Sequence, residues 1–200
     1  GHPADRRGTV APVTPRLAKR GIQQQRSRVY AGRNQPARRA RLSHAALPGS
    51  ERLRVGLAWA GNPHHKNDAN RSIAWEQFAT LTELDGVDFF SLQVGPRAAD
   101  CAGSEVVSLE GQLNDVAATA AVIEPLDLVI TVDTAVAHLA GALGKPTWVL
   151  ITAMPDWRWQ LSRTDSPWYS QVKLYRQDAG KAGWPKTLDR VKQDLPKRLA

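Results

Sequence analysis

A polar turn follows an apolar run in the stretch LVITVDTAVAHLAGALGKP, which spans residues 128–146. Five strand-forming residues lead into Asp133 and Thr134, and His138 follows at helical spacing. A carboxylate accepts hydrogen bonds, a hydroxyl donates or accepts, and an imidazole does either near neutral pH. The residues after the turn have the pattern of a helix that stops at Gly-Lys-Pro. The stretch therefore predicts a buried strand that delivers three polar side chains to the start of a helix.

A second polar group follows the apolar run RVGLAWAG. Gly61 has no Cβ and lets a ligand approach the backbone, while Lys66 and Arg71 could neutralise a diphosphate. A helix that begins near Thr134 would present free N–H groups to an anion. The carboxylate of Asp133 suits sugar hydroxyls better than phosphate. Together these residue types favour a ligand in which a diphosphate is attached to a sugar.

Alternating strand and helix patterns must position these two groups. Short apolar runs predict strands at 54–61, 87–95, 105–111, 127–133, 147–152 and 172–177. Helical patterns lie between them at 72–84, 96–103, 115–126 and 134–146, and a closing helix begins near 185. The alternation predicts one doubly wound, Rossmann-like α/β domain over residues 51–200, with a parallel sheet in the order 3-2-1-4-5-6.

The predicted strand order brings the two polar groups together. The first and fourth strands are then neighbours whose connections leave toward opposite faces, so a crevice opens at their carboxyl ends. Gly61 and Asn62 end the first strand, and Asp133 and Thr134 end the fourth. The sequence therefore predicts a binding crevice at this switch point.

Each of these residues also has an ordinary structural explanation. Asp133 or Thr134 could serve only as the helix N-cap, and His138 could be a hydrogen-bonded core residue. Lys66 and Arg71 could be solvated loop cations. Their convergence on one crevice favours the binding interpretation.

Spacing argues against two phosphate-binding motifs and a metal site. The first strand leads into GLAWAGNP rather than G-x-G-x-x-G, which disfavours a nicotinamide dehydrogenase. GALGKPT is no P-loop, because it ends a helix, Lys145 precedes proline and Leu139 stands where a glycine is needed. His64 and His65 have no second cluster at metal-ligand spacing. We expect no metal and no cofactor.

The positive charge of the chain lies in its first quarter. The net charge is +8, and residues 1–50 hold 11 of the 27 Lys and Arg residues but only one of the 19 acidic residues. The segment lacks helix or strand periodicity, which indicates a mostly disordered basic arm. It also lacks a pattern of interleaved aromatic residues, so nucleic acid is not the favoured partner. If the arm does bind nucleic acid or anionic surfaces, that binding should fall steeply with salt.

A single cysteine and the lengths of the apolar runs bear on the cellular context. Cys101 has no partner for an internal disulfide, so nothing points to an oxidising compartment. No apolar run approaches the roughly 18 residues of a membrane span, and no leader resembles a signal peptide. We therefore expect a cytoplasmic protein without a membrane span.

Three segments resemble the family 9 glycosyltransferases, which are of the heptosyltransferase type. They are VGLAWAGNPHHKNDANRSI, DLVITVDTAVAHLAGALGKPTWVL and PDWRW…DSPWY, and the resemblance covers about residues 52–200. It is closest to the branch found behind tetratricopeptide repeats. The resemblance implies one half of a GT-B fold, which binds a nucleotide-sugar donor, while another domain supplies the acceptor site and usually the catalytic base. It also implies transfer with inversion and without a metal.

The resemblance assigns roles to residues around the predicted crevice. Lys66 resembles the family's lysine near the donor phosphates, and Asp133 resembles its donor-sugar carboxylate. Thr134, Ala135 and His138 resemble the start of the donor-binding helix.

Two further segments resemble the rim of the family's donor site. Gln93 lies in a loop that resembles a segment bordering the nucleotide. Trp157 and Trp159 follow the fifth strand, where an indole could stack on a base or a sugar. The alternative is that these tryptophans hold a long loop in place.

The first 50 residues show no βαβ pattern of an acceptor domain, which needs well over about 100 residues. We therefore expect the donor-binding domain of an inverting glycosyltransferase, a fragment completed by an acceptor domain or a repeat domain on another chain. Two alternatives stay open. One is a non-catalytic interaction module or remnant, and the other is a sugar-nucleotide epimerase of similar architecture.

Overall fold

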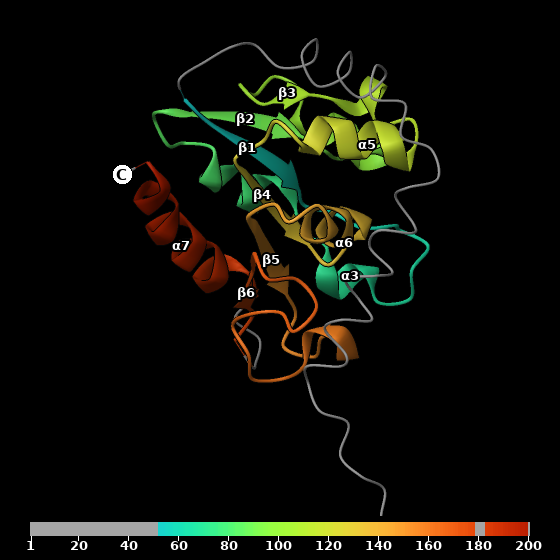
Figure 1. Ribbon diagram of the computed structural model, residues 1–200, viewed down its shortest axis with the longest axis vertical. Helices are drawn as coiled ribbons and strands as arrows, with labels where there is room; N and C mark the ends of the chain where they lie inside the picture. The colour runs from blue at the N-terminus through green and yellow to red at the C-terminus, as the bar shows by residue number, and fades with distance from the viewer. Residues whose placement is uncertain (1–51, 179–182, 200) are drawn as a thin grey trace, which may run out of the picture. The chain divides into compact units, whose positions relative to one another are not determined.

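Six strands form one sheet in the computed structural model, which describes residues 52–178 and 183–199 (Figure 1). In sheet order they are β3 (Val107–Ser108), β2 (Val87–Ser91), β1 (Leu53–Ala58), β4 (Leu128–Val132), β5 (Thr147–Ile151) and β6 (Val172–Arg176). All neighbouring pairs are parallel. The predicted α/β class and the strand order 3-2-1-4-5-6 are therefore confirmed.

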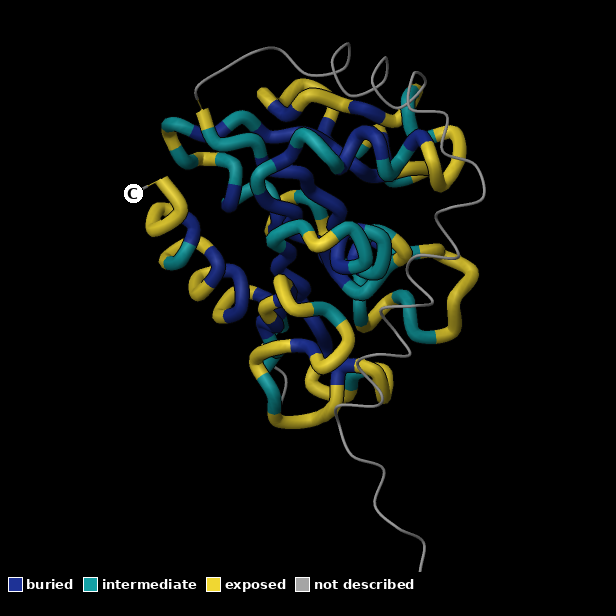
Figure 2. Tube along the Cα trace, in the orientation of Figure 1, coloured by how far each residue is buried: buried dark blue, intermediate teal, exposed yellow. Residues whose placement is uncertain are grey.

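The central strands are buried on both faces because helices cover the sheet on both sides. Every residue of β4 and β5 is buried, which is typical of parallel strands in the middle of such a sheet (Figure 2). In β1, a Cβ on Gly56 would come within 2.6 Å of Leu126 and 2.8 Å of Leu92. The glycine therefore lets the segment before β4 pack directly against the sheet.

Helices on the two faces of the sheet enclose separate apolar clusters. α5 (Val116–Ile123) and α6 (Ala135–Ala142) cover one face, and α4 (Trp75–Phe78) and α7 (Pro185–Asp194) cover the other (Figure 1). The short helical segments are α3 (Asp68–Arg71), η1 (Ala79–Leu81), η2 (Gly95–Cys101), η3 (Glu110–Gln112), η4 (Trp157–Trp159) and η5 (Leu195–Arg198).

The helix predicted over 72–84 is shorter in the structure, where α4 passes into η1 after one turn. Two threonines explain the change. Thr80 donates to the carbonyl of Gln77 and Thr82 to that of Ala79, both at 2.8 Å. Such local side-chain bonds compete with regular helical pairing.

The predicted arm over residues 1–50 lies outside the described residues, so it and the boundary at residue 51 stay predictions. In the part of the chain that the structure describes, no helix is long and apolar enough to cross a bilayer.

Asp194, at the end of α7, joins this helix to β6. Its Oδ2 accepts hydrogen bonds from Lys173 Nζ at 2.5 Å and Tyr175 OH at 2.8 Å. Its Oδ1 accepts one from Lys197 Nζ at 2.6 Å. The bonds from Lys173, Lys197 and Tyr175 hold the pKa of the Asp194 carboxyl far below its usual range. The carboxylate form therefore stabilises the folded chain.

Replacing Asp194 by asparagine should lower the free energy of unfolding by about 1 kcal/mol at pH 7, because both lysines are largely solvated. A depressed folded-state pKa stabilises the protein above the unfolded pKa, near 4, and this contribution fades as the pH falls below it. Urea unfolding between pH 7 and pH 2.5 measures the free energy of unfolding of the unchanged chain and of Asp194→Asn. The difference between the two should become smaller as the pH falls. Asp165→Asn, which breaks a fully exposed pair with Arg163, is the control and should have a smaller effect. A gap that keeps the same size from pH 7 to pH 2.5 would contradict the prediction.

Candidate functional site

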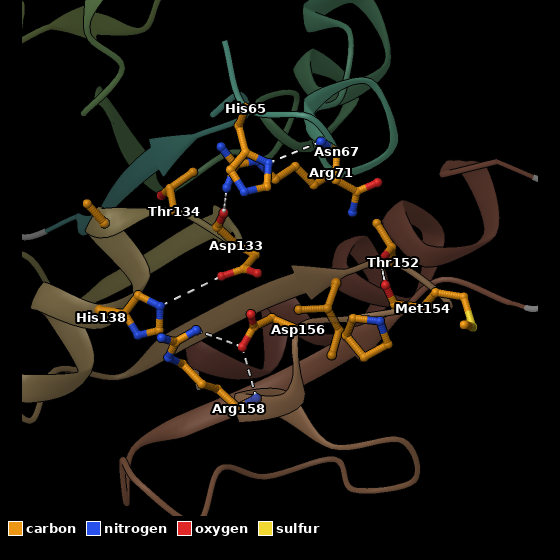
Figure 3. A pocket seen from close by; sticks show the side chains of 13 residues that line it. His65, Asn67, Arg71, Asp133, Thr134, His138, Thr152, Met154, Asp156 and Arg158 are labelled. Carbon is orange, nitrogen blue, oxygen red and sulfur yellow. Dashed lines mark hydrogen bonds and ion pairs between the residues drawn. The ribbon is translucent and has the colours of Figure 1, made fainter. Parts of the chain in front are cut away.

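A cavity of about 360 Å³ opens at the carboxyl ends of β4 and β5, beside the loop that follows β1 (Figure 3). This is the switch point of the sheet, because the chain leaves the neighbouring strands β1 and β4 toward opposite faces. The lining residues are His65, Asn67, Arg71, Asp133, Thr134, Ala135, His138, Ile151, Thr152, Met154, Pro155, Asp156 and Arg158. The volume lies in the range of small-molecule sites.

Arg71 is fixed on one wall of the cavity by its own loop. Its Nε donates to Asp68 Oδ1 at 3.1 Å, and its Nη1 donates to the backbone carbonyl of Asp133 at 3.1 Å. Ser72 also donates to Asp68 Oδ1, and it accepts from the backbone N–H of Gly61, both at 2.9 Å. A Cβ on Gly61 would overlap the guanidinium of Arg71. The glycine predicted to admit a ligand therefore makes room for the arginine.

Asp133 and His138 face each other at the start of α6. The Oδ1 of Asp133 lies 3.8 Å from the Nε2 of His138, and both side chains line the cavity (Figure 3). Thr134 occupies the N-cap position, but its side chain makes no capping hydrogen bond. Its hydroxyl lies 3.2 Å from the hydroxyl of Thr131 instead. The side chain of Thr134 therefore leaves the first amides of α6 uncapped.

The imidazole of His138 is held between two aromatic side chains. It stacks on Trp159 with ring centroids 5.2 Å apart and an interplanar angle of 15°. Its Nδ1 lies 3.1 Å from the hydroxyl of Tyr169. Burial lowers the pKa of His138, and the nearby Asp133 only partly opposes this effect. The ring is therefore neutral at pH 7.

The opposite rim of the cavity comes from the loop after β5. Asp156 accepts hydrogen bonds from the backbone N–H of Arg158 at 3.0 Å and from its Nη1 at 2.8 Å. Burial alone would raise the pKa of Asp156, but these bonds from Arg158 lower it overall. The guanidinium of Arg158 also lies 4.9 Å from the ring centre of Trp157. The rim thus pairs a cation and a carboxylate beside an exposed indole.

Five of the predicted site residues line the cavity. They are Arg71, Asp133, Thr134, Ala135 and His138. Lys66 and Asn62 are exposed in the loop after β1 and are not among the lining residues. His65 and Asn67, on either side of Lys66, do line the cavity, so the loop reaches the cavity without its lysine.

Gln93 and Trp159 are buried and are not among the residues that line the cavity. The Oε1 of Gln93 accepts from the backbone N–H groups of Trp59 and Ala60, and its Nε2 donates to the carbonyl of Ala60 at 3.0 Å. Gln93 therefore ties the end of β1 to the end of β2. Trp159 has no exposed surface and supports His138, whereas Trp157 is 67% exposed. Of the two tryptophans, only Trp157 is exposed, and the guanidinium of Arg158 lies over its ring.

Sequence reasoning missed several lining residues. His65 accepts a hydrogen bond on Nδ1 from the backbone N–H of Asn67 at 3.2 Å. Thr152 and Met154 line the cavity because β5 is the neighbour of β4. The positions of Thr152 and Met154 could have been predicted, since the carboxyl end of the next parallel strand must lie at the same edge of the sheet. Nothing in the sequence indicated that His65, rather than the adjacent His64, would line the cavity.

The charges of the cavity are mixed rather than uniformly basic. Arg71 and Arg158 provide two cations, and Asp133 and Asp156 provide two carboxylates. Among the described residues, no group of three or more His, Cys, Asp or Glu side chains could hold a metal ion. The arrangement can bind an anionic group and hydroxyl groups of the same ligand.

The doubly wound sheet with a polar cavity at its switch point defines a Rossmann-like domain with a candidate ligand site. Within it, residues 97–188 match the family model described as glycosyltransferase family 9 (heptosyltransferase). The chain is also 30% identical over 149 residues to Protein FlbA of Caulobacter vibrioides. That match covers 69% of this chain and 24% of FlbA.

Two solved structures share the fold of the domain. The ADP-heptose lps heptosyltransferase II of E. coli has a TM-score of 0.59 and 16% identity, over 84% of this chain and 52% of its own. The glycosyl transferase family 9 structure from Veillonella parvula has a TM-score of 0.59 and 12% identity, over 82% of this chain and 51% of its own. The chain thus spans about half the length of these structures.

Residues 97–188 thus match the family 9 (heptosyltransferase) model, and the α/β domain shares the fold of the two solved structures. The predicted link to tetratricopeptide repeats stays a prediction.

Proposed function

We propose that this domain binds the nucleotide-sugar donor of an inverting, metal-independent glycosyltransferase. The observation that carries the proposal is the mixed cavity at the switch point. There Arg71 and the start of α6 form one wall, Asp133 and His138 lie at the base, and Arg158 lies on the rim. Cations and helix amides suit a diphosphate, whereas a carboxylate suits sugar hydroxyls.

The proposal orients the donor in the cavity. The diphosphate would lie between Arg71 and the first amides of α6, near Thr134 and Ala135. The sugar would lie against Asp133, whose carboxylate accepts hydrogen bonds from its hydroxyls. The exposed indole of Trp157 would be the surface for a base or sugar to stack on.

Catalysis in this proposal requires groups beyond the described residues. An acceptor hydroxyl would attack the anomeric carbon, the bond from that carbon to the diphosphate oxygen would break, and the configuration would invert. A base from a second domain would take the hydroxyl proton. Arg71 and the α6 amides would stabilise the leaving nucleoside diphosphate. The acceptor domain and the cytoplasmic location both stay predictions.

Thermal unfolding of the full chain with nucleotides tests the proposal. ADP, UDP and GDP would each be compared with their sugar conjugates at increasing concentration. One nucleotide family should raise Tm in a saturable way, since a ligand at 100 times its Kd stabilises by about 2.7 kcal/mol. If no nucleotide shifts a cooperative transition, the donor-binding role is wrong and the interaction-module alternative takes its place.

A further inference from the structure

The segment DSPWY ends beside the cavity, and donor binding as proposed above gives it no role. We propose that its last residue, Tyr169, is a positioning residue, whose hydroxyl donates to Nδ1 of His138 and holds the tautomer with Nε2–H toward Asp133 and the cavity. Nδ1 lies 3.1 Å from the tyrosine hydroxyl, and Nε2 lies 3.8 Å from Oδ1 of Asp133. The benefit to donor binding rests on the proposed function, whereas the tautomer does not.

The direction of the hydrogen bond follows from the charge on the far side of the ring. A neutral imidazole carries one N–H and one lone pair. If the lone pair were on Nε2, it would face the carboxylate of Asp133, which is unfavourable. With the proton on Nε2, the N–H faces the carboxylate, and Nδ1 is left to accept from Tyr169.

The neutral state of His138 is required for this choice. Three charged side chains face the ring besides the hydroxyl of Tyr169: Asp133, Arg158 and Asp156. Burial lowers the pKa of His138 more than Asp133 raises it, and Arg158 lowers it further. The imidazole is therefore neutral at pH 7 and has a tautomer to select.

Tyr169 is itself held in place from two sides. The buried Ser166 accepts hydrogen bonds on Oγ from the backbone N–H groups of Trp168 at 3.2 Å and Tyr169 at 3.3 Å. On α6, a Cβ on Gly141 would lie 2.7 Å from Cγ of Tyr169. The missing side chain at Gly141 thus lets the tyrosine ring lie directly on the helix that carries His138.

A fixed Nε2–H gives the cavity a directed donor. In water the two neutral tautomers of histidine interconvert freely, so an unrestrained ring would present a donor for only part of the time. With Tyr169 on Nδ1, His138 can donate to an acceptor oxygen of the ligand, on a phosphate or a sugar. The role of Tyr169 is to orient this donor, and Tyr169 itself is not among the lining residues.

Nitrogen-15 spectra of the histidine side chains of the full chain test the proposal without a ligand. The His138 signals are assigned by their loss in His138→Gln, and the titration is followed from pH 5 to pH 8. We expect the Nε2–H tautomer in the unchanged chain. In Tyr169→Phe the neutral ring loses its hydrogen bond, so the pKa of His138 should rise. Affinity for the nucleotide sugar should fall about threefold to tenfold.

Two matched controls separate positioning from general damage. Tyr175→Phe removes a tyrosine hydroxyl bound to Asp194, far from α6, and should leave the His138 titration unchanged. Gly141→Ala should displace the Tyr169 ring and raise the pKa of His138, whereas Gly111→Ala, with open space around its Cβ, should not.

An Nδ1–H tautomer, or a pKa of His138 that falls or stays constant in Tyr169→Phe, would overturn the assignment. An unchanged chain that binds no nucleotide would instead defeat the proposed function, and the tautomer assignment would stand on its spectra.

Discussion

Asp133→Ala should weaken binding of the nucleotide sugar by about 10- to 100-fold while leaving the bare nucleotide bound as well or better. The carboxylate accepts charge-assisted hydrogen bonds from sugar hydroxyls, which contribute about 1.5–3 kcal/mol. The bare nucleotide has no sugar for Asp133 to bind, and its diphosphate is repelled by the same carboxylate. Isothermal titration of both ligands against both chains measures the difference.

Asp156→Ala is the matched control for this prediction. It removes an equal charge from the same cavity, but its carboxylate is already occupied by Arg158. The difference in affinity between the nucleotide sugar and the bare nucleotide should therefore be retained in Asp156→Ala and be lost in Asp133→Ala. Equal losses for both ligands in Asp133→Ala would mean that Asp133 supports the site without contacting the sugar.

Arg71→Ala should weaken the bare nucleotide and the nucleotide sugar by similar factors of about tenfold or more. The side chain of Arg71 is only 16% exposed and its guanidinium is held by hydrogen bonds to Asp68 and to the carbonyl of Asp133, so it meets a phosphate with little loss of side-chain entropy. Arg71→Lys should recover part of the affinity, because it keeps the charge and loses the planar contact with the carbonyl of Asp133. The loss should shrink as salt screens the charge.

Lys66→Ala provides the comparison for Arg71→Ala in the same loop. Lys66 is exposed and does not line the cavity, so its removal should cost less affinity. Unfolding by urea checks that Arg71→Ala still folds, since it also breaks the contact with Asp68. Unchanged nucleotide affinity in a folded Arg71→Ala chain would remove this arginine from the phosphate site. A loss of the same size in Lys66→Ala would place the lysine there as well.

Regular patterns explain why the fold could be predicted. The runs at β4 and β5 are mostly apolar and buried at every position because parallel strands are covered on both faces, and Gly144 and Pro146 stop α6. The predicted lengths of the elements were less accurate, most clearly where local side-chain hydrogen bonds compete with the regular hydrogen bonds of a helix. Thr80 and Thr82 shorten the helix after β1, and the edge strand β3 keeps only two residues.

The candidate site was predictable only in part, because tertiary packing brings the side chains of loops together. Loops have no regular hydrophobic repeat from which their contacts could be predicted. Asp133 and Thr134 line the cavity, since they directly follow β4 and the neighbours of that strand follow from the strand order. Gln93 also follows a strand, β2, yet its side chain is buried and pairs with the backbone of Trp59 and Ala60. The position of a residue after a strand does not reveal whether its side chain points into the cavity or into the core.

The sequence by itself determined the α/β class, the strand order and the edge of the sheet at which the cavity opens. These follow from local periodicity and from the handedness of strand connections, which act along the chain. The tertiary structure alone decided which cation faces the cavity, that Trp159 lies beneath His138, and that Tyr169 meets its imidazole across 31 residues. Gly61 leaves space for the side chain of Arg71, and Gly141 leaves space for the ring of Tyr169. The hydrophobic periodicity of the sequence does not indicate where such space will be needed.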